Sequence, residues 1–259
     1  MLRFVARDRL LGGTALAFAG VFLVLAALAL ADPQQITGLN RWIKPMKFAI
    51  SIAIFLATVA WFTADLDPSR RRARTLITRT MVVTMVVEIV CIVGQAARGT
   101  TSHFNDRSAL DGAIFTLMGI AITVNTVAVA AMLWALRRDT PPARAGYLAG
   151  VRLGLAVFVV GSLLGFVIVA NNGHSVPGPD GGPGLPVLNW ALDRGDLRVA
   201  HFIGLHALQA LPLLGALLDR SAAAPARRTR VVGTVAAVWL VLMGTTLALA
   251  VGGRPLLAL

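Results

Sequence analysis

The sequence predicts an all-α, multi-pass membrane protein with seven transmembrane helices forming one bundle over residues 1–259. Of its 259 residues, 57% are hydrophobic and only 14% are charged, whereas a soluble domain has about 25% charged residues. The mean hydropathy is +0.76. This composition excludes a water-soluble domain and a disordered chain, because disorder requires low hydrophobicity.

Seven apolar runs are long enough to cross about 30 Å of hydrocarbon as helices. They lack the alternation of apolar and polar residues that barrel strands show. The first run ends in Ala29-Leu30-Ala31 and resembles a signal peptide, but its length favours a retained helix. The predicted spans lie near residues 10–31, 45–65, 75–98, 110–136, 148–170, 198–219 and 231–251.

The net charge of +12 comes from arginines grouped between the apolar runs. Cytoplasmic loops of membrane proteins are enriched in such residues. The pattern predicts a cytoplasmic amino terminus and an outer carboxyl terminus in a bacterial cytoplasmic (inner) membrane, with the lipid bilayer as partner and no nucleic acid. The clusters are Arg3, Arg7 and Arg9; Arg70, Arg71, Arg72 and Arg74; Arg137, Arg138 and Arg144; and Arg220, Arg227, Arg228 and Arg230.

One connecting segment, residues 171–197, is much longer than the others and is predicted to lie on the outer side. Its four prolines exclude a helix in its first half. Leu185, Leu188 and Trp190 indicate a segment packed on the bundle as a lid, because loops of this length are usually functional or disordered.

A polar stripe runs along the third predicted helix. Glu88, the only glutamate of the chain, falls near the middle of the membrane, where a charge costs a few kcal/mol. Its neighbours at helical spacing are Thr80, Thr84, Cys91 and Gln95. The stripe is either a hydrogen-bonded seam with a protonated Glu88 or part of a proton relay, an ion site or a ligand cavity.

Two lysines begin the second predicted helix. Lys44, Lys47 and Ser51 share one face, and Pro45 suits a first helical turn. The lysines either extend to the interface beside Trp42 or hold an anion.

All four histidines fall on the predicted outer side. His103 and His174 lie in loops, whereas His201 and His206 lie in the sixth predicted helix, with Gln209 on the face of His206. The spacing of five excludes an i,i+4 metal-ligand pair on that helix. His206 is the first choice as a ligand of a metal or haem because it lies deepest; His201 and His174 follow.

Three segments resemble those of a family of bacterial multi-pass inner-membrane proteins to which no activity is attached. They are Trp42–Ser51, Arg98–Asn105 and Gly195–Gln209, with the sequences WIKPMKFAIS, RGTTSHFN and GDLRVAHFIGLHALQ. The resemblance implies a common outer-face fold and assigns no functional residue.

Three classes of function fit these patterns. The first is an outward-facing cavity that binds a metal, haem or an anionic lipid-like ligand, with redox or transfer chemistry; haem or a divalent metal would then be the cofactor. The second is a proton-coupled transporter that uses Glu88, and the third is a non-catalytic assembly or sensor protein. No P-loop, zinc-protease or nucleophile-elbow motif indicates a catalytic site. The predicted ligand-binding residues are Lys44, Lys47, Glu88, Gln95, Arg98, His103, Asn105, Asp196, Arg198 and Gln209.

Overall fold

A computed structural model describes residues 7–257 and confirms the predicted fold class. Seven of its helices are long and apolar enough to cross a membrane. They are α2 (Arg9–Ala31), α3 (Ile43–Phe62), α4 (Arg71–Ala97), α5 (Ala109–Ala135), α6 (Ala145–Ala170), α7 (Leu197–Leu218) and α8 (Pro225–Val251).

Helices α4 and α8 begin several residues before the predicted spans. A hydropathy pattern detects the part of a helix that lies in lipid, but a helix continues into polar sequence when its first turn is favourable. Pro225 occupies the first turn of α8, where its missing N–H costs nothing. Asp67 caps the short 3₁₀ turn Pro68–Arg70 that leads into α4, and accepts a hydrogen bond from the Ser69 N–H.

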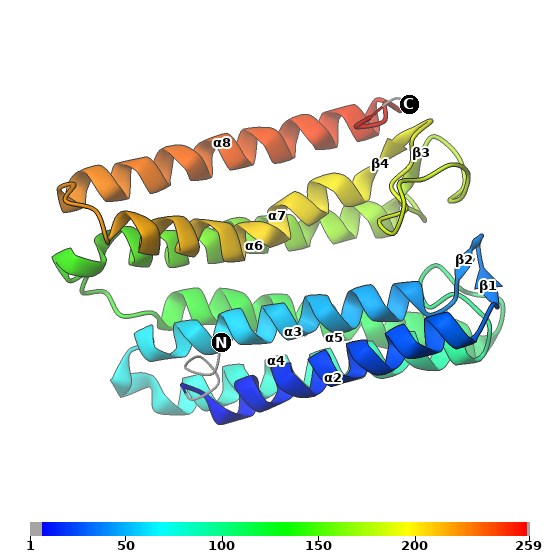
Figure 1. The fold of residues 1–259 in the computed structure, drawn as a ribbon, viewed down its shortest axis with the longest axis horizontal. Coiled ribbons are helices and arrows are strands. Elements are labelled where there is room, and N and C mark those ends of the chain that lie inside the picture. Colours follow the sequence, from blue (N-terminus) through cyan, green and yellow to red (C-terminus); the bar gives the residue numbers. More distant parts are fainter. Residues whose placement is uncertain (1–6, 258–259) are drawn as a thin grey trace. The chain divides into compact units, whose positions relative to one another are not determined.

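The chain divides into two compact units, one ending at Leu136 and the other beginning at Arg137. The N-terminal unit contains α2 to α5, in which α2 packs on α3, α4 on α5, and α3 on α4. A hairpin of β1 (Gln35–Ile36) and β2 (Leu39–Asn40) joins α2 to α3. Successive helices run in opposite directions (Figure 1).

The C-terminal unit contains α6 to α8, and its closest packing is between α6 and α7 (Figure 1). Glycines permit this approach. A Cβ atom added to Gly161 would lie 2.6 Å from the Gly204 Cα. Such contacts between small residues drive helix association in membranes, where apolar side chains gain nothing by leaving lipid.

The segment between α6 and α7 is ordered by its own short pairings. Strand β3 (Ser175–Val176) pairs with β4 (Gly195–Asp196), and Gly184 forms a bridge with Ala191. The absence of a helix in the first half of this segment, predicted from its prolines, is confirmed.

The arginine pattern predicts which ends of the helices face the cytoplasm, and cysteine labelling can test this. In a Cys91→Ala background, a cysteine at position 180 should react with an impermeant thiol reagent in intact cells. A cysteine at position 222 should react only after the membrane is opened. The reverse pattern would contradict the predicted orientation.

Candidate functional site

Glu88 is buried inside the N-terminal unit, and 5% of its surface is exposed. Its Oε1 atom has no hydrogen-bond partner among the described residues. Glu88 precedes the end of α4 at Ala97 by nine residues, or about 13 Å along the axis. An unpartnered carboxyl oxygen at this depth is costly, since burying a polar group without a hydrogen bond costs free energy.

The polar stripe of α4 faces inward at Glu88 and at residues one turn before and two turns after it. Thr84 and Gln95 are buried. The Thr84 hydroxyl lies 3.4 Å from Oδ1 of Asn125, a buried side chain of α5. Thr80 and Cys91 are only half-buried. The stripe thus lies partly on the α4–α5 contact, as an interhelical seam or an internal polar path requires.

Lys44 and His103 meet at the end of the unit where α3 begins and α4 ends. The Lys44 ammonium lies 3.1 Å from Nδ1 of His103, and Lys44 also acts electrostatically on Glu88. An ammonium group can only donate, so Nδ1 of His103 accepts and the imidazole is neutral. The ammonium of Lys44 thus contacts a histidine of the connecting loop, while only its charge reaches the buried carboxyl of α4.

His103 is half-buried, and the rings of Phe48, Phe104 and Phe115 lie around it at centroid distances of 5.9–6.3 Å. Burial, and secondarily the Lys44 charge, lower the pKa of His103 well below its ordinary value of 6.5. His103 can thus accept a hydrogen bond from Lys44 at neutral pH.

A second group of predicted residues, Gln95 and Arg98, converges on Asp111 at the start of α5. Asp111 accepts hydrogen bonds from Gln95 Nε2 at 2.9 Å and from Arg98 Nη1 at 2.8 Å. Ser108 caps α5 and donates its hydroxyl to the same carboxylate at 2.7 Å. These residues satisfy one another, which is typical of a structural network.

Asn105 is buried in the loop that carries His103. Its amide donates to the Thr100 hydroxyl at 2.9 Å and to the Thr101 carbonyl at 2.8 Å. Asn105 thus fixes the loop, and its contacts do not point to a ligand. Ser51, which the sequence places on the face of Lys44 and Lys47, does not share their surroundings: Ser51 is exposed, whereas both lysines are half-buried.

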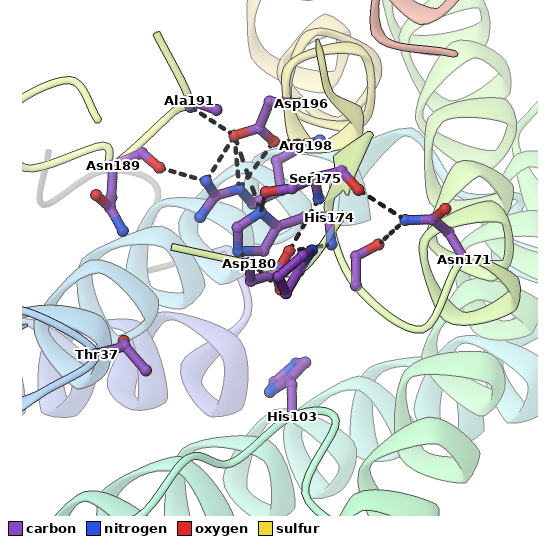
Figure 2. Close-up of polar contacts among 12 residues, drawn as sticks. Thr37, His103, Asn171, His174, Ser175, Asp180, Asn189, Ala191, Asp196 and Arg198 are labelled. Carbon is purple, nitrogen blue, oxygen red and sulfur yellow. Dashed lines mark hydrogen bonds and ion pairs between the residues drawn. The ribbon is translucent and has the colours of Figure 1, made fainter. Parts of the chain in front are cut away.

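In the C-terminal unit, Asp196 organises the long loop (Figure 2). Its carboxylate accepts hydrogen bonds from the Ala191 N–H at 3.0 Å and from the Arg198 N–H and guanidinium at 3.0 and 2.6 Å. Arg198 also donates to the Asn189 carbonyl. Asp196 is the N-cap of α7, so one side chain joins the helix start to the loop.

His174 lies near the same carboxylate (Figure 2). Its Nδ1 is 4.0 Å from Asp196, and its Nε2 is 3.1 Å from Asp180. Asp180 also accepts from the backbone N–H groups of His174 and Ser175. Burial opposes ionisation of Asp196, but the hydrogen bonds and charge of Arg198 hold its pKa below the ordinary value of 3.8.

The two histidines of α7 lie in different surroundings within their unit. His201 donates from Nδ1 to the Gly161 carbonyl of α6 at 2.8 Å. His206 donates from Nδ1 to the Phe202 carbonyl of its own helix at 2.8 Å and stacks on the Phe202 ring. His206 is half-exposed, as is Gln209.

Within residues 7–257, no group of three or more His, Cys, Asp and Glu side chains is placed to hold a metal ion. The metal and haem assignments of His206, His201 and His174 remain predictions without a ligand set. A single cavity shared by Lys44, Lys47 and His206 is also still a prediction, because these residues belong to different units.

Four polar residues of these clusters are not predicted from the sequence: Asp111, Asn125, Asp180 and Asn189. A capping pattern, Ser108 followed three residues later by Asp111, indicates the start of α5 and could have drawn attention to the first. The others carry no comparable signal.

Comparison with known proteins assigns no relative to this chain: no protein-family model, curated protein or solved structure matches it.

Proposed function

We propose that this chain is a proton-coupled carrier of a small solute in the bacterial cytoplasmic membrane, with Glu88 as its proton-binding group. The observation that carries the proposal is the carboxyl group of Glu88, buried nine residues before the end of α4 with an oxygen that has no hydrogen-bond partner among the described residues. Ionisable residues inside membrane spans commonly belong to ion pathways and proton relays.

The neighbours of Glu88 support a proton path rather than an isolated buried acid. Lys44 acts on Glu88 and contacts His103 at 3.1 Å, and His103 reaches the surface of the loop that ends α4. Neutral imidazole can accept a proton at one nitrogen and release one at the other. For a proton to leave Glu88 along this path, the Lys44 ammonium first donates a proton to Nδ1 of His103, and His103 releases one from Nε2. The neutral Lys44 amine then accepts the Glu88 proton when water or a side-chain movement closes the remaining gap.

The proposal also includes membership in the family of bacterial inner-membrane proteins that the sequence resembles. Two of the three segments that carry it, Trp42–Ser51 and Arg98–Asn105, supply Lys44 and His103. The third segment contains Asp196, whose contacts fix the long loop.

The test follows the proton on Glu88 directly. Infrared difference spectra of the full chain in liposomes should show a protonated-carboxyl band that disappears as the pH is raised. Glu88→Gln should remove this band without unfolding the protein, because a neutral amide replaces a neutral acid of similar shape. Asp193→Asn, at an exposed carboxylate, is the control and should leave the band unchanged.

A second arm tests the path. When the medium is changed to D₂O, exchange of the Glu88 proton for deuterium should shift the carboxyl band. The rate of this shift should be severalfold lower in His103→Gln than in the unaltered chain. A band that never titrates would indicate a permanently protonated structural seam and would contradict the proposal. An unchanged exchange rate in His103→Gln would exclude the path through His103.

A further inference from the structure

Three exposed arginines lie at the start of α4, in the N-terminal unit, and none of their guanidinium groups has a hydrogen-bond or ion-pair partner within residues 7–257. A shallow groove of about 370 Å³ is lined there by Arg71, Arg72, Thr75, Leu76 and Arg79. All five side chains are exposed. Their spacing places them on one side of the helix, because residues three, four and eight positions apart share a face.

Two neighbouring arginines, Arg70 and Arg74, differ from those of the groove because their guanidinium groups bind other parts of the N-terminal unit. Arg70 donates to the Trp134 carbonyl and stacks on the Trp134 ring. Arg74 donates to the Arg7 carbonyl and pairs with Asp8 at 3.3 Å. In contrast, the guanidinium groups of the groove make no hydrogen bond or ion pair with any residue in the described part of the chain.

The same face of α4 becomes apolar immediately beyond the groove. Leu76, Val83 and Val90 follow at intervals of seven residues and are 69%, 61% and 63% exposed. The intervals are two helical turns, so these side chains form one stripe that begins between the arginines. The face therefore offers cationic, hydrogen-bonding groups at one end and an apolar surface along the rest.

An anionic glycerophospholipid has the complementary shape and chemistry. Its phosphodiester accepts two parallel hydrogen bonds from a guanidinium, and its acyl chain can lie along an apolar stripe. We propose that Arg71, Arg72 and Arg79 bind the phosphodiester headgroup of an anionic phospholipid whose acyl chain packs on Leu76, Val83 and Val90. This site is independent of proton binding at Glu88.

The lipid site does not include Glu88, so lipid binding can be tested without knowing which solute the protein carries. The delipidated full chain is titrated with phosphatidylglycerol, and with phosphatidylcholine of the same acyl chains, and bound lipid is counted by native mass spectrometry. Phosphatidylglycerol should bind more tightly. In the double variant Arg72→Gln/Arg79→Gln its affinity should fall about 25-fold, from roughly fivefold for each arginine near a membrane surface.

The matched control is Arg107→Gln/Arg220→Gln, which removes the same charge from two exposed loop positions. Its affinity for phosphatidylglycerol should stay within about twofold of the unaltered chain, since distant surface charges are screened. Equal losses in the two variants would overturn the proposal, because attraction to net charge would then suffice. Displacement of the lipid by millimolar inorganic phosphate would also overturn it, because the acyl stripe would then contribute nothing.

Discussion

Asp196→Ala is expected to lower the free energy of unfolding by about 3 kcal/mol, the lower end of the range for a broken buried ion pair. The side chain is 1% exposed, and its removal leaves the Ala191 N–H, the start of α7 and Arg198 without their acceptor. Arg198 keeps contact with water, so the full cost of an isolated buried charge is not incurred.

The effect should be measured by unfolding in mixed detergent micelles and by hydrogen exchange. Protection should be lost first in residues 174–198, because these are the segments that Asp196 connects. Asp193→Ala is the matched control: this carboxylate is exposed and pairs with its neighbour Arg194, so its removal should change stability little. An equal effect of both variants would show that Asp196 does not organise the loop.

The stabilisation by Asp196 should also depend on pH in a defined direction. Its pKa is lowered in the folded protein, so its contribution is fully present above the ordinary value of 3.8 and is lost as the pH falls through the folded value. The difference in unfolding free energy between Asp196→Ala and the unaltered chain should therefore shrink as the pH is lowered below about 4.

Gly161→Leu is expected to destabilise the C-terminal unit by about 3 kcal/mol or more, the upper range for an overpacked core. A Cβ at this position would lie 2.6 Å from the Gly204 Cα and 3.0 Å from the Leu205 N. Both neighbours are backbone atoms, which cannot rotate away, so α6 and α7 must separate. The separation would also break the hydrogen bond from His201 to the Gly161 carbonyl.

Gly244→Leu in α8 is the control for this variant. No atom lies within 4 Å of a Cβ built there, and a leucine is a better helix former than a glycine. Its stability should equal or exceed that of the unaltered chain. Comparable losses in both variants would mean that the contact between Gly161 and Gly204 does not hold α6 against α7.

The number and approximate bounds of the helices follow from the sequence, because lipid imposes one requirement on every span. Backbone groups must be satisfied within each span, and about twenty apolar residues are needed to cross the hydrocarbon. Helix starts are less predictable. Pro225 and Asp67 favour helix starts through local backbone geometry and hydrogen bonding in polar sequence, and a hydropathy pattern does not detect these effects.

The polar clusters were predictable only in part. The sequence indicates Glu88 because a carboxyl group inside an apolar run is rare, and Asp196 because it directly precedes the sixth predicted span. The pairing of Lys44 with His103 joins residues 59 positions apart, and helical periodicity carries no information about such partners. Asp180 lies in a loop whose course depends on backbone turns and on the pairing of β3 with β4, which the glycines and prolines permit without specifying.

The end of the first unit at Leu136 bears on how the protein is synthesised. Every helix that supports Glu88, Lys44 and His103 precedes Arg137, so the ribosome completes this set before any of α6 emerges. Domains generally fold as units, with the N-terminal one first. The N-terminal unit contains four candidate spans, and in the predicted topology this even number returns the growing chain to the side of the membrane where it began. Nascent chains arrested shortly after α5 should therefore already have Glu88, Lys44 and His103 in their final arrangement. This arrangement does not require the later helices α6 to α8.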